Sequence, residues 1–151
     1  MITHCDHIGI QVRDLDRSVE FYCQVMGFTV NDRFTKSEPY LQELVGYPGV
    51  ELDIAVLGIP GSPVELEILE YRNVDRRPVD PQTANPGTAH FCLFVTDIDE
   101  LVCRVKQFGG GAVSAVQTST AGPVAGCRLV YLTDPDGIRV ELVERPPTAS
   151  R

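Results

Sequence analysis

The sequence predicts an α+β fold made of two tandem β-α-β-β-β modules, and three observations lead to this prediction. Residues Asp6–Asp16 match Ala89–Asp99 at a constant offset of 83 residues. Residues Val64–Glu70 match Ile138–Glu144 at an offset of 74 residues. In both copies, a short run of β-branched and aromatic residues ends at an aspartate, and apolar residues at helical spacing follow it.

The first module is predicted to begin with a strand over residues 7–12. Leu15, Val19, Tyr22 and Met26 recur at helical intervals, and Gly27 is a typical helix end. Three further strands are expected over residues 28–34, 52–57 and 64–69.

The second module repeats this order, with a strand over residues 90–95. Asp97 and Glu100 have the spacing of a capping box, and the helix that they begin is expected to end at Gly109. Strands are expected over residues 112–116, 128–132 and 138–143, with a turn at Asp134–Gly137 before the last.

The whole chain, residues 1–151, is therefore predicted to be a single domain of two modules. The first spans about residues 4–71 and the second about residues 87–145. The polar, proline-containing stretch of residues 72–86 is expected to link them, and the tail of residues 146–151 is expected to fray.

Composition excludes several functions. The net charge of −8 would repel phosphate backbones and anionic membranes, so neither nucleic acid nor a membrane is an expected partner. No segment approaches the roughly 18 consecutive apolar residues of a membrane span, and no leader pattern opens the chain, so we expect a cytoplasmic protein. The five cysteines are widely spaced, without a Cys-x-x-Cys pair that would indicate zinc or redox chemistry.

Strand alternation separates the polar residues of the first strands from the apolar ones. Ile8, Ile10 and Val12 are expected beneath the first helix, which places His7, Gly9 and Gln11 on the opposite face. By the same alternation, His90, Cys92 and Phe94 share the corresponding face of the second module. We expect these faces to be concave.

The last strand of each module offers carboxylates to the same face. Glu65 and Glu67 alternate with apolar residues in the first module, as Arg139 and Glu141 do in the second. An unpaired carboxylate in an apolar strand is costly to bury, and a cation would compensate it.

One histidine and one glutamate per module therefore predict a shared divalent-metal site of His7, Glu67, His90 and Glu141. Two imidazoles and two carboxylates suit nickel, cobalt, zinc, manganese or ferrous iron, with open positions for a small-molecule substrate. The alternative is a pair of core or rim histidines beside solvated glutamates.

Neighbouring residues complete the predicted site. Glu65 is a rival ligand, whereas Glu70 and Glu144 belong to the opposite face. Arg139 is expected either to bind an anionic group of the substrate or to form a salt bridge with Glu65 or Glu141. We expect the substrate-binding residues to be Gln11, Cys92, Phe94 and Arg139.

Four segments together resemble the vicinal oxygen chelate superfamily: Asp6–Leu15, Glu67–Tyr71, His90 and Asp134–Leu142. This superfamily includes glyoxalase I, methylmalonyl-CoA epimerase, extradiol dioxygenases, fosfomycin-resistance enzymes and bleomycin-binding proteins. The resemblance covers nearly the whole chain and implies a curved mixed sheet around a central metal cleft, in a homodimer. The metal positions that it implies are the two histidines and two glutamates named above.

The resemblance also implies a lyase or isomerase of glyoxalase or epimerase type, because dioxygenases of the superfamily typically use two histidines and one glutamate. Glu141 or Glu67 would move a proton next to a carbonyl that is chelated to the metal. Two alternatives remain: a ferrous extradiol-type dioxygenase, and a binding protein that sequesters an antibiotic without catalysis.

Two departures bear on the substrate. Glyoxalase I usually has an arginine where Gln11 stands and an asparagine where Tyr71 stands, both associated with glutathione. Methylmalonyl-CoA epimerases place an acidic residue near Tyr47–Val50, where this chain has none.

Overall fold

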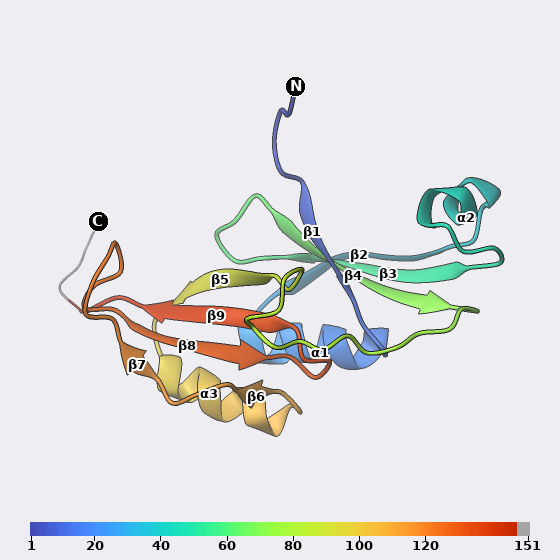
Figure 1. Cartoon of the computed structure of the whole chain (residues 1–151). Coiled ribbons are helices and arrows are strands. Elements are labelled where there is room, and N and C mark those ends of the chain that lie inside the picture. Colours follow the sequence, from blue (N-terminus) through green and yellow to red (C-terminus); the bar gives the residue numbers. More distant parts are fainter. Residues whose placement is uncertain (148–151) are drawn as a thin grey trace. The chain divides into compact units, whose positions relative to one another are not determined.

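The computed structural model describes residues 1–147 and divides the chain into two compact units that adjoin between Pro78 and Val79. The first unit contains β1 (His7–Gln11), α1 (Leu15–Met26), β2 (Thr29–Lys36), α2 (Pro39–Val45), β3 (Glu51–Gly58) and β4 (Glu65–Arg72) (Figure 1). The second contains β5 (His90–Val95), α3 (Ile98–Gln107), β6 (Gly111–Ala112), β7 (Gln117–Thr118), β8 (Arg128–Thr133) and β9 (Arg139–Glu144). The tail predicted to fray lies mostly outside the described residues.

Each unit builds one mixed sheet, which confirms the α+β class. In the first, the strand order is β1-β4-β3-β2, and in the second it is β5-β9-β8-β6, with β7 also paired to β8. The first and last strands of each unit, β1 with β4 and β5 with β9, run parallel, and the remaining pairs are antiparallel. None of the helices within residues 1–147 has the length and apolarity that crossing a membrane requires.

The parallel pairs share one register. His7 is the partner of Glu65 in the first unit, and His90 is the partner of Arg139 in the second. Two residues after each of these partners comes a glutamate, Glu67 in β4 and Glu141 in β9. Because strand residues two positions apart share a face, each glutamate lies diagonally across from its histidine on the same face of the sheet. The predicted assignment of faces is confirmed.

The other face of each sheet packs against a helix. Leu66 and Ile68 of β4 are fully buried, as are Val140 and Leu142 of β9. Within the first unit, α1 supplies Tyr22, whose ring stacks on Phe28 with centroids 5.7 Å apart. Burial of these apolar side chains supplies most of the driving force for packing helix against sheet.

Both long helices begin at the predicted aspartates. The Asp14 carboxylate accepts a hydrogen bond from Arg17 N–H at 2.9 Å, and Asp97 accepts one from Glu100 N–H at 3.1 Å. A second carboxylate joins each cap, since Glu70 accepts from Leu15 N–H and Glu144 accepts from Ile98 N–H. Negative charge at a helix N-terminus is stabilising, so these glutamates tie the last strand to the helix.

The expected strand over residues 112–116 is wrong. Ala112 pairs with Leu132, but the next pair along β8 joins Gln117 to Leu129, so the chain between them has more residues than the strand that it faces. Val113 N–H still donates to the Tyr131 carbonyl of β8, but residues 114–116 leave the ladder, and β6 and β7 remain as two-residue strands.

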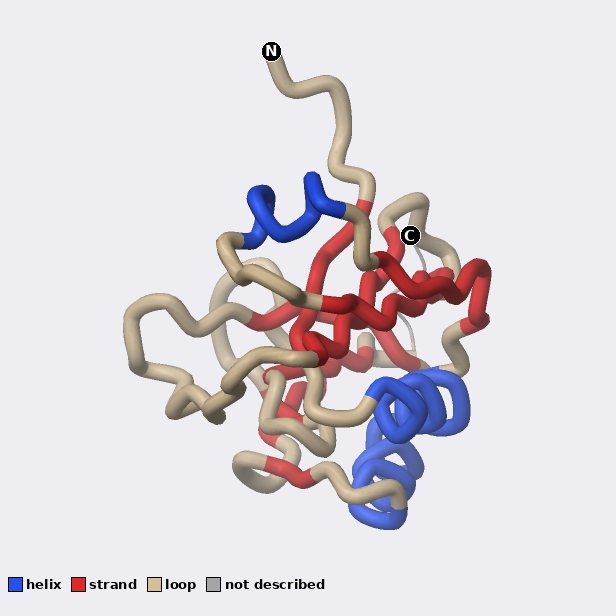
Figure 2. The backbone as a smooth tube through the Cα atoms, turned by 90° about the vertical axis from the view of Figure 1, so that its right-hand side faces the viewer, coloured by secondary structure: helices blue, strands red, loops and turns tan. Residues whose placement is uncertain are grey.

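Helix α2 was not predicted from the sequence. Its seven residues begin with Pro39 and end before Gly46, which adopts a left-handed φ of 78°. The strands lie between α2 and α1 (Figure 1, Figure 2). Leu41 of α2 packs in a cluster with Ile54 and Leu69, two residues on the same face as Glu67, so α2 covers part of that face.

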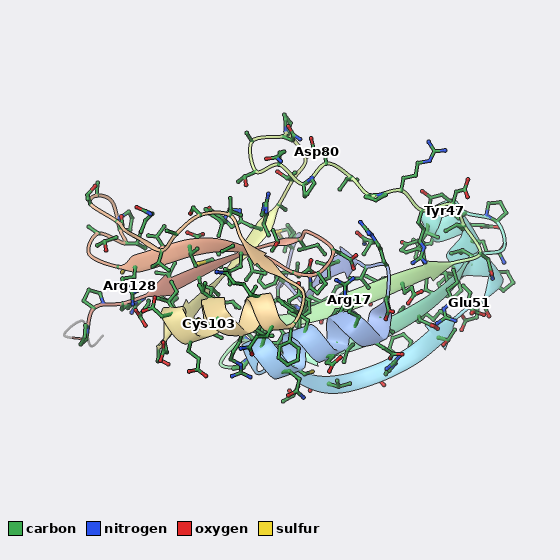
Figure 3. The ribbon with its side chains drawn as sticks, turned by 90° about the horizontal axis from the view of Figure 1, so that it is seen from below. Arg17, Tyr47, Glu51, Asp80, Cys103 and Arg128 are labelled. Carbon is green, nitrogen blue, oxygen red and sulfur yellow. The ribbon has the colours of Figure 1, made fainter. Side chains whose placement is uncertain are left out.

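The Glu144 cap generates a prediction about stability. Its carboxylate accepts hydrogen bonds from Ile98 N–H and from the Arg128 guanidinium, which also binds Asp99 at the beginning of α3 (Figure 3). Glu144→Ala removes both bonds and should lower the free energy of unfolding by about 2 kcal/mol, measured by urea denaturation. Glu20→Ala, at an exposed position of α1, is the matched control and should change it by less than about 0.5 kcal/mol. Equal effects would contradict the capping role.

Candidate metal and substrate site

The first unit brings His7 and Glu67 together. His7 Nε2 lies 3.4 Å from Glu67 Oε2, and the Glu67 side chain is 21% exposed. The parallel pairing of β1 with β4 creates this contact, because it puts both side chains on the face opposite α1. A nitrogen donor and an oxygen donor thus face one another across two adjacent strands.

The other ring nitrogen of His7 is held by the preceding residue. His7 Nδ1 lies 2.9 Å from Asp6 Oδ2, and since a carboxylate only accepts hydrogen bonds, Nδ1 carries the proton. This hydrogen bond raises the pKa of His7 above its ordinary value, and the charge of Glu67 adds to the rise, whereas burial opposes it. In the neutral ring, the lone pair is then on Nε2, directed toward Glu67.

The second unit repeats the pair. His90 Nε2 lies 3.3 Å from Glu141 Oε2, whose side chain is 20% exposed. The Tyr131 hydroxyl is 3.4 Å from the same His90 nitrogen, and the two rings meet edge to face. The cysteine beside them, Cys92, hydrogen-bonds Glu141; burial and the nearby Glu141 charge raise the pKa of its thiol to about 11.

The two pairs differ in their neighbours. Gly9 occupies in β1 the position that Cys92 occupies in β5, so Glu67 has no thiol beside it. A Cβ atom at Gly9 would lie 3.8 Å from Glu67 Oε2 and 3.6 Å from Leu69. On this side Glu67 is therefore bordered by a glycine and an apolar side chain, whereas Glu141 is bordered by a thiol that hydrogen-bonds it.

Each unit supplies two donors. Within residues 1–147 no group of three or more His, Cys, Asp or Glu side chains is arranged to hold a metal ion. A site with four ligands therefore needs both the His7–Glu67 pair and the His90–Glu141 pair, and each unit contains only one of them.

The other predicted site residues have different surroundings. Glu65 accepts a 2.6 Å hydrogen bond from the Asn31 side-chain amide. Gln11 is exposed, and Phe94 is exposed with the Arg145 guanidinium 4.3 Å above its ring. Arg139 is buried, and no Arg139–Glu141 salt bridge forms within residues 79–147.

Two tyrosine rings form an apolar wall beside Glu67 that the sequence did not predict. Tyr71 and Tyr47 meet edge to face with centroids 6.1 Å apart, and burial raises the pKa of the Tyr71 hydroxyl. Tyr47, which follows α2, is labelled in Figure 3. Proline at the first helical position and glycine after the last were the available signals for this helix.

The fold agrees with a comparison to known families. Residues 4–142 match the model of the Glyoxalase/Bleomycin resistance protein/Dioxygenase superfamily. The chain belongs to this superfamily. This is the vicinal oxygen chelate group that the motifs indicated.

Relatives within the superfamily include enzymes of two kinds. A 2-epi-5-epi-valiolone epimerase from Actinomyces sp. is 31% identical, over 95% of this chain and 80% of its own. A lactoylglutathione lyase from Escherichia coli O157:H7 is 33% identical, over 91% of this chain and 90% of its own. Some plant relatives are longer: the chain spans 36% of a probable chloroplastic lactoylglutathione lyase from Arabidopsis thaliana.

A solved structure shares the fold. The glyoxalase family protein APC24694 from Bacillus cereus superposes with a TM-score of 0.78 at 23% identity, covering 95% of both chains. At this identity, the likeness supports the arrangement of strands and helices alone.

The Asp6–His7 hydrogen bond gives a prediction about titration. Asp6→Asn should lower the pKa of His7 toward its ordinary value in the metal-free protein, measured by NMR titration of the imidazole proton signals. Because the folded pKa of His7 is raised, this bond stabilises the fold at pH below the ordinary histidine pKa, and the benefit is lost as pH rises through the raised one. Asp16→Asn, on the helix side, is the control and should leave the His7 titration unchanged. An unaltered His7 titration in Asp6→Asn would refute the orienting role.

Proposed function

We propose that the chain is a divalent-metal-dependent lyase or isomerase that transfers a proton next to a carbonyl of a small molecule. One observation carries the proposal: each unit presents the same His–Glu pair, at 3.4 and 3.3 Å, on the same face of its sheet. The bond between His7 Nδ1 and Asp6 supports a ligating role, since metal-binding histidines commonly donate their second ring N–H to a carboxylate or carbonyl.

The donors fit a divalent cation. His7, Glu67, His90 and Glu141 would hold it, when the two kinds of pair meet within one chain or across a homodimer. Their mixed nitrogen and oxygen set suits nickel, cobalt, zinc, manganese or ferrous iron. When bound, such an ion supplies Lewis-acid stabilisation of the negative charge that develops on chelated substrate oxygens.

The two glutamates are the groups that would move the proton. A carboxylate oxygen of Glu141 or Glu67 accepts a proton from the carbon next to the carbonyl, and the electron pair of the broken C–H bond shifts toward the carbonyl oxygen. Where the deprotonated carbon bears a hydroxyl, returning that proton to the former carbonyl carbon, while the hydroxyl proton passes to the former carbonyl oxygen, gives an isomerised product with the carbonyl moved to the first carbon. Returning it to the opposite face of the same carbon gives an epimer.

The immediate surroundings give the two glutamates different assignments. Cys92 stays protonated at neutral pH and hydrogen-bonds Glu141, so this carboxylate is held by a neighbour while it accepts the substrate proton. Glu67 stands beside Gly9 and Leu69, neither of which offers its carboxylate a hydrogen-bonding side chain. We therefore assign the principal base to Glu141 and a supporting acid–base role to Glu67.

The named relatives support this class of reaction, because they comprise lactoylglutathione lyases and an epimerase. Gln11 and Tyr71, at positions associated with glutathione in glyoxalase I, favour a substrate without a glutathione moiety. A small carbonyl compound enclosed by the apolar wall of Tyr47 and Tyr71 fits these surroundings better.

Glu141→Gln tests the catalytic assignment. The purified protein is loaded with nickel, cobalt, zinc, manganese or ferrous iron and incubated in D₂O with S-lactoylglutathione or 2-epi-5-epi-valiolone. Mass spectrometry then measures solvent deuterium entering the C–H bond next to the carbonyl. The wild-type protein should exchange at least one of the two compounds, and Glu141→Gln should lose at least about 100-fold in rate while keeping its circular dichroism spectrum.

Other outcomes would redirect the proposal. Full exchange by Glu141→Gln would remove Glu141 from the mechanism. Oxygen uptake with a catechol by the ferrous protein would indicate a dioxygenase, and stoichiometric binding of an antibiotic by the metal-free protein would indicate a sequestering protein.

A further inference from the structure

We infer that the substrate carries an anionic oxygen group, a carboxylate or a phosphate, and that Arg139 binds it beside the metal-chelating oxygens. This inference rests on the proposed function, because it places the anion next to the same His–Glu pair. It adds a class of substrate and a specificity-determining residue to that function.

Arg139 lies in the row of the sheet next to Glu141. It alternates with Glu141 along β9, so both residues belong to the face opposite α3. Its register partners are His90 on one side and Thr133 on the other. A group that reaches Arg139 therefore also lies beside His90.

Arg139 is buried without a counter-charge in its own unit. The residue is only 9% exposed, and its Nε atom is buried without a hydrogen-bond acceptor. Within residues 79–147, no carboxylate lies within 4.0 Å of its guanidinium nitrogens.

Other arginines of the chain follow the opposite pattern. Four arginines with side chains between 40 and 50% exposed each have a carboxylate partner: Arg33 with Asp16, Arg72 with Asp53, Arg76 with Glu70, and Arg128 with Asp99 and Glu144. Arg139 is the more buried residue and has the greater need for a partner.

The buried positive charge of Arg139 can be compensated only by a partner. A guanidinium stays protonated in proteins, so Arg139 cannot escape the cost of burial by losing its charge, as a lysine can. An uncompensated buried charge destabilises the fold. A planar pair of anionic oxygens would satisfy the guanidinium through two parallel hydrogen bonds.

The glutamate on the same face of β9 and the residue equivalent to Arg139 in β4 both have other partners. Glu141 contacts His90, and Glu65, which holds the corresponding position in β4, accepts a hydrogen bond from Asn31. The repeat thus replaces an acidic residue of the first unit by a basic one in the second. A site with an acidic residue at the one position and a basic residue at the other distinguishes the two ends of a substrate.

Binding measurements test the inference on the full-length protein loaded with one metal. Isothermal titration calorimetry compares three probes: hydroxypyruvate, dihydroxyacetone phosphate and neutral dihydroxyacetone. The variants are Arg139→Met, which keeps an apolar stem without the charge, and Arg139→Lys, which keeps the charge without the planar fork. Arg33→Met is the matched control, because it removes the same charge from an exposed arginine that pairs with Asp16 of α1.

At least one anionic probe should bind Arg139→Met at least about tenfold more weakly than it binds the wild-type protein. Arg139→Lys should lie between the two, and dihydroxyacetone should not distinguish the variants. Comparison across variants removes any contribution of a probe carboxylate to metal chelation, and the identity of the favoured probe separates carboxylate from phosphate.

Thermal unfolding of the metal-free protein provides a second readout. Removing an unpaired buried charge should leave the Tm of Arg139→Met unchanged or higher. A fall of about 5 °C or more would assign Arg139 to the fold and overturn the inference. So would equal binding of both anionic probes by the wild-type protein and Arg139→Met, or an equal loss of binding in Arg33→Met. Unchanged metal binding with any of these results would leave the proposed metal site standing.

Discussion

Parallel pairing of the first and last strands is the constraint on which each unit depends. The pairs β1 with β4 and β5 with β9 have one register, which sets a histidine one row from a glutamate in both units. A slip of one residue would turn every side chain of the last strand to the opposite face. It would separate His7 from Glu67 and remove Glu70 from the N-terminus of α1 at the same time.

The alternation of side chains lets one strand serve both fold and site. Along β9, Glu141 faces His90, and Glu144, on the opposite face, accepts from the first N–H of α3. Each half-buried carboxylate thereby meets a group that offsets its loss of hydration. Arg139 on the same strand has no such group within its unit, and for this reason we propose it as a binding residue.

Much of this organisation can be predicted from the sequence, because it depends on local periodicity. The repeat and the two-residue alternation of strands predicted the faces of His7 and Glu67, and the aspartates at positions 14 and 97 predicted where helices begin. Helix α2 is too short for its periodicity to be distinguished from a loop. The bulge after Ala112 depends on the strand that it faces, which local sequence does not reveal.

Burial is the second property that the sequence did not disclose. Asp134–Leu142 reads as a turn followed by a strand, and its residue types left open whether Arg139 binds a substrate or a glutamate. Only its depth in the structure and the absence of a nearby carboxylate within residues 79–147 favour the substrate. Similarly, the repeat predicts four ligands, while the structure brings these side chains together as one His–Glu pair in each unit.

Metal stoichiometry tests most directly whether the two pairs form one site. Protein purified without chelators, and each of the variants His7→Ala and His90→Ala, would be examined by elemental analysis and native mass spectrometry. One shared site of four ligands predicts about one divalent ion per chain in the wild-type protein and loss of most of that ion in both variants. Two ions per chain, or full retention of the ion in either variant, would contradict a shared site.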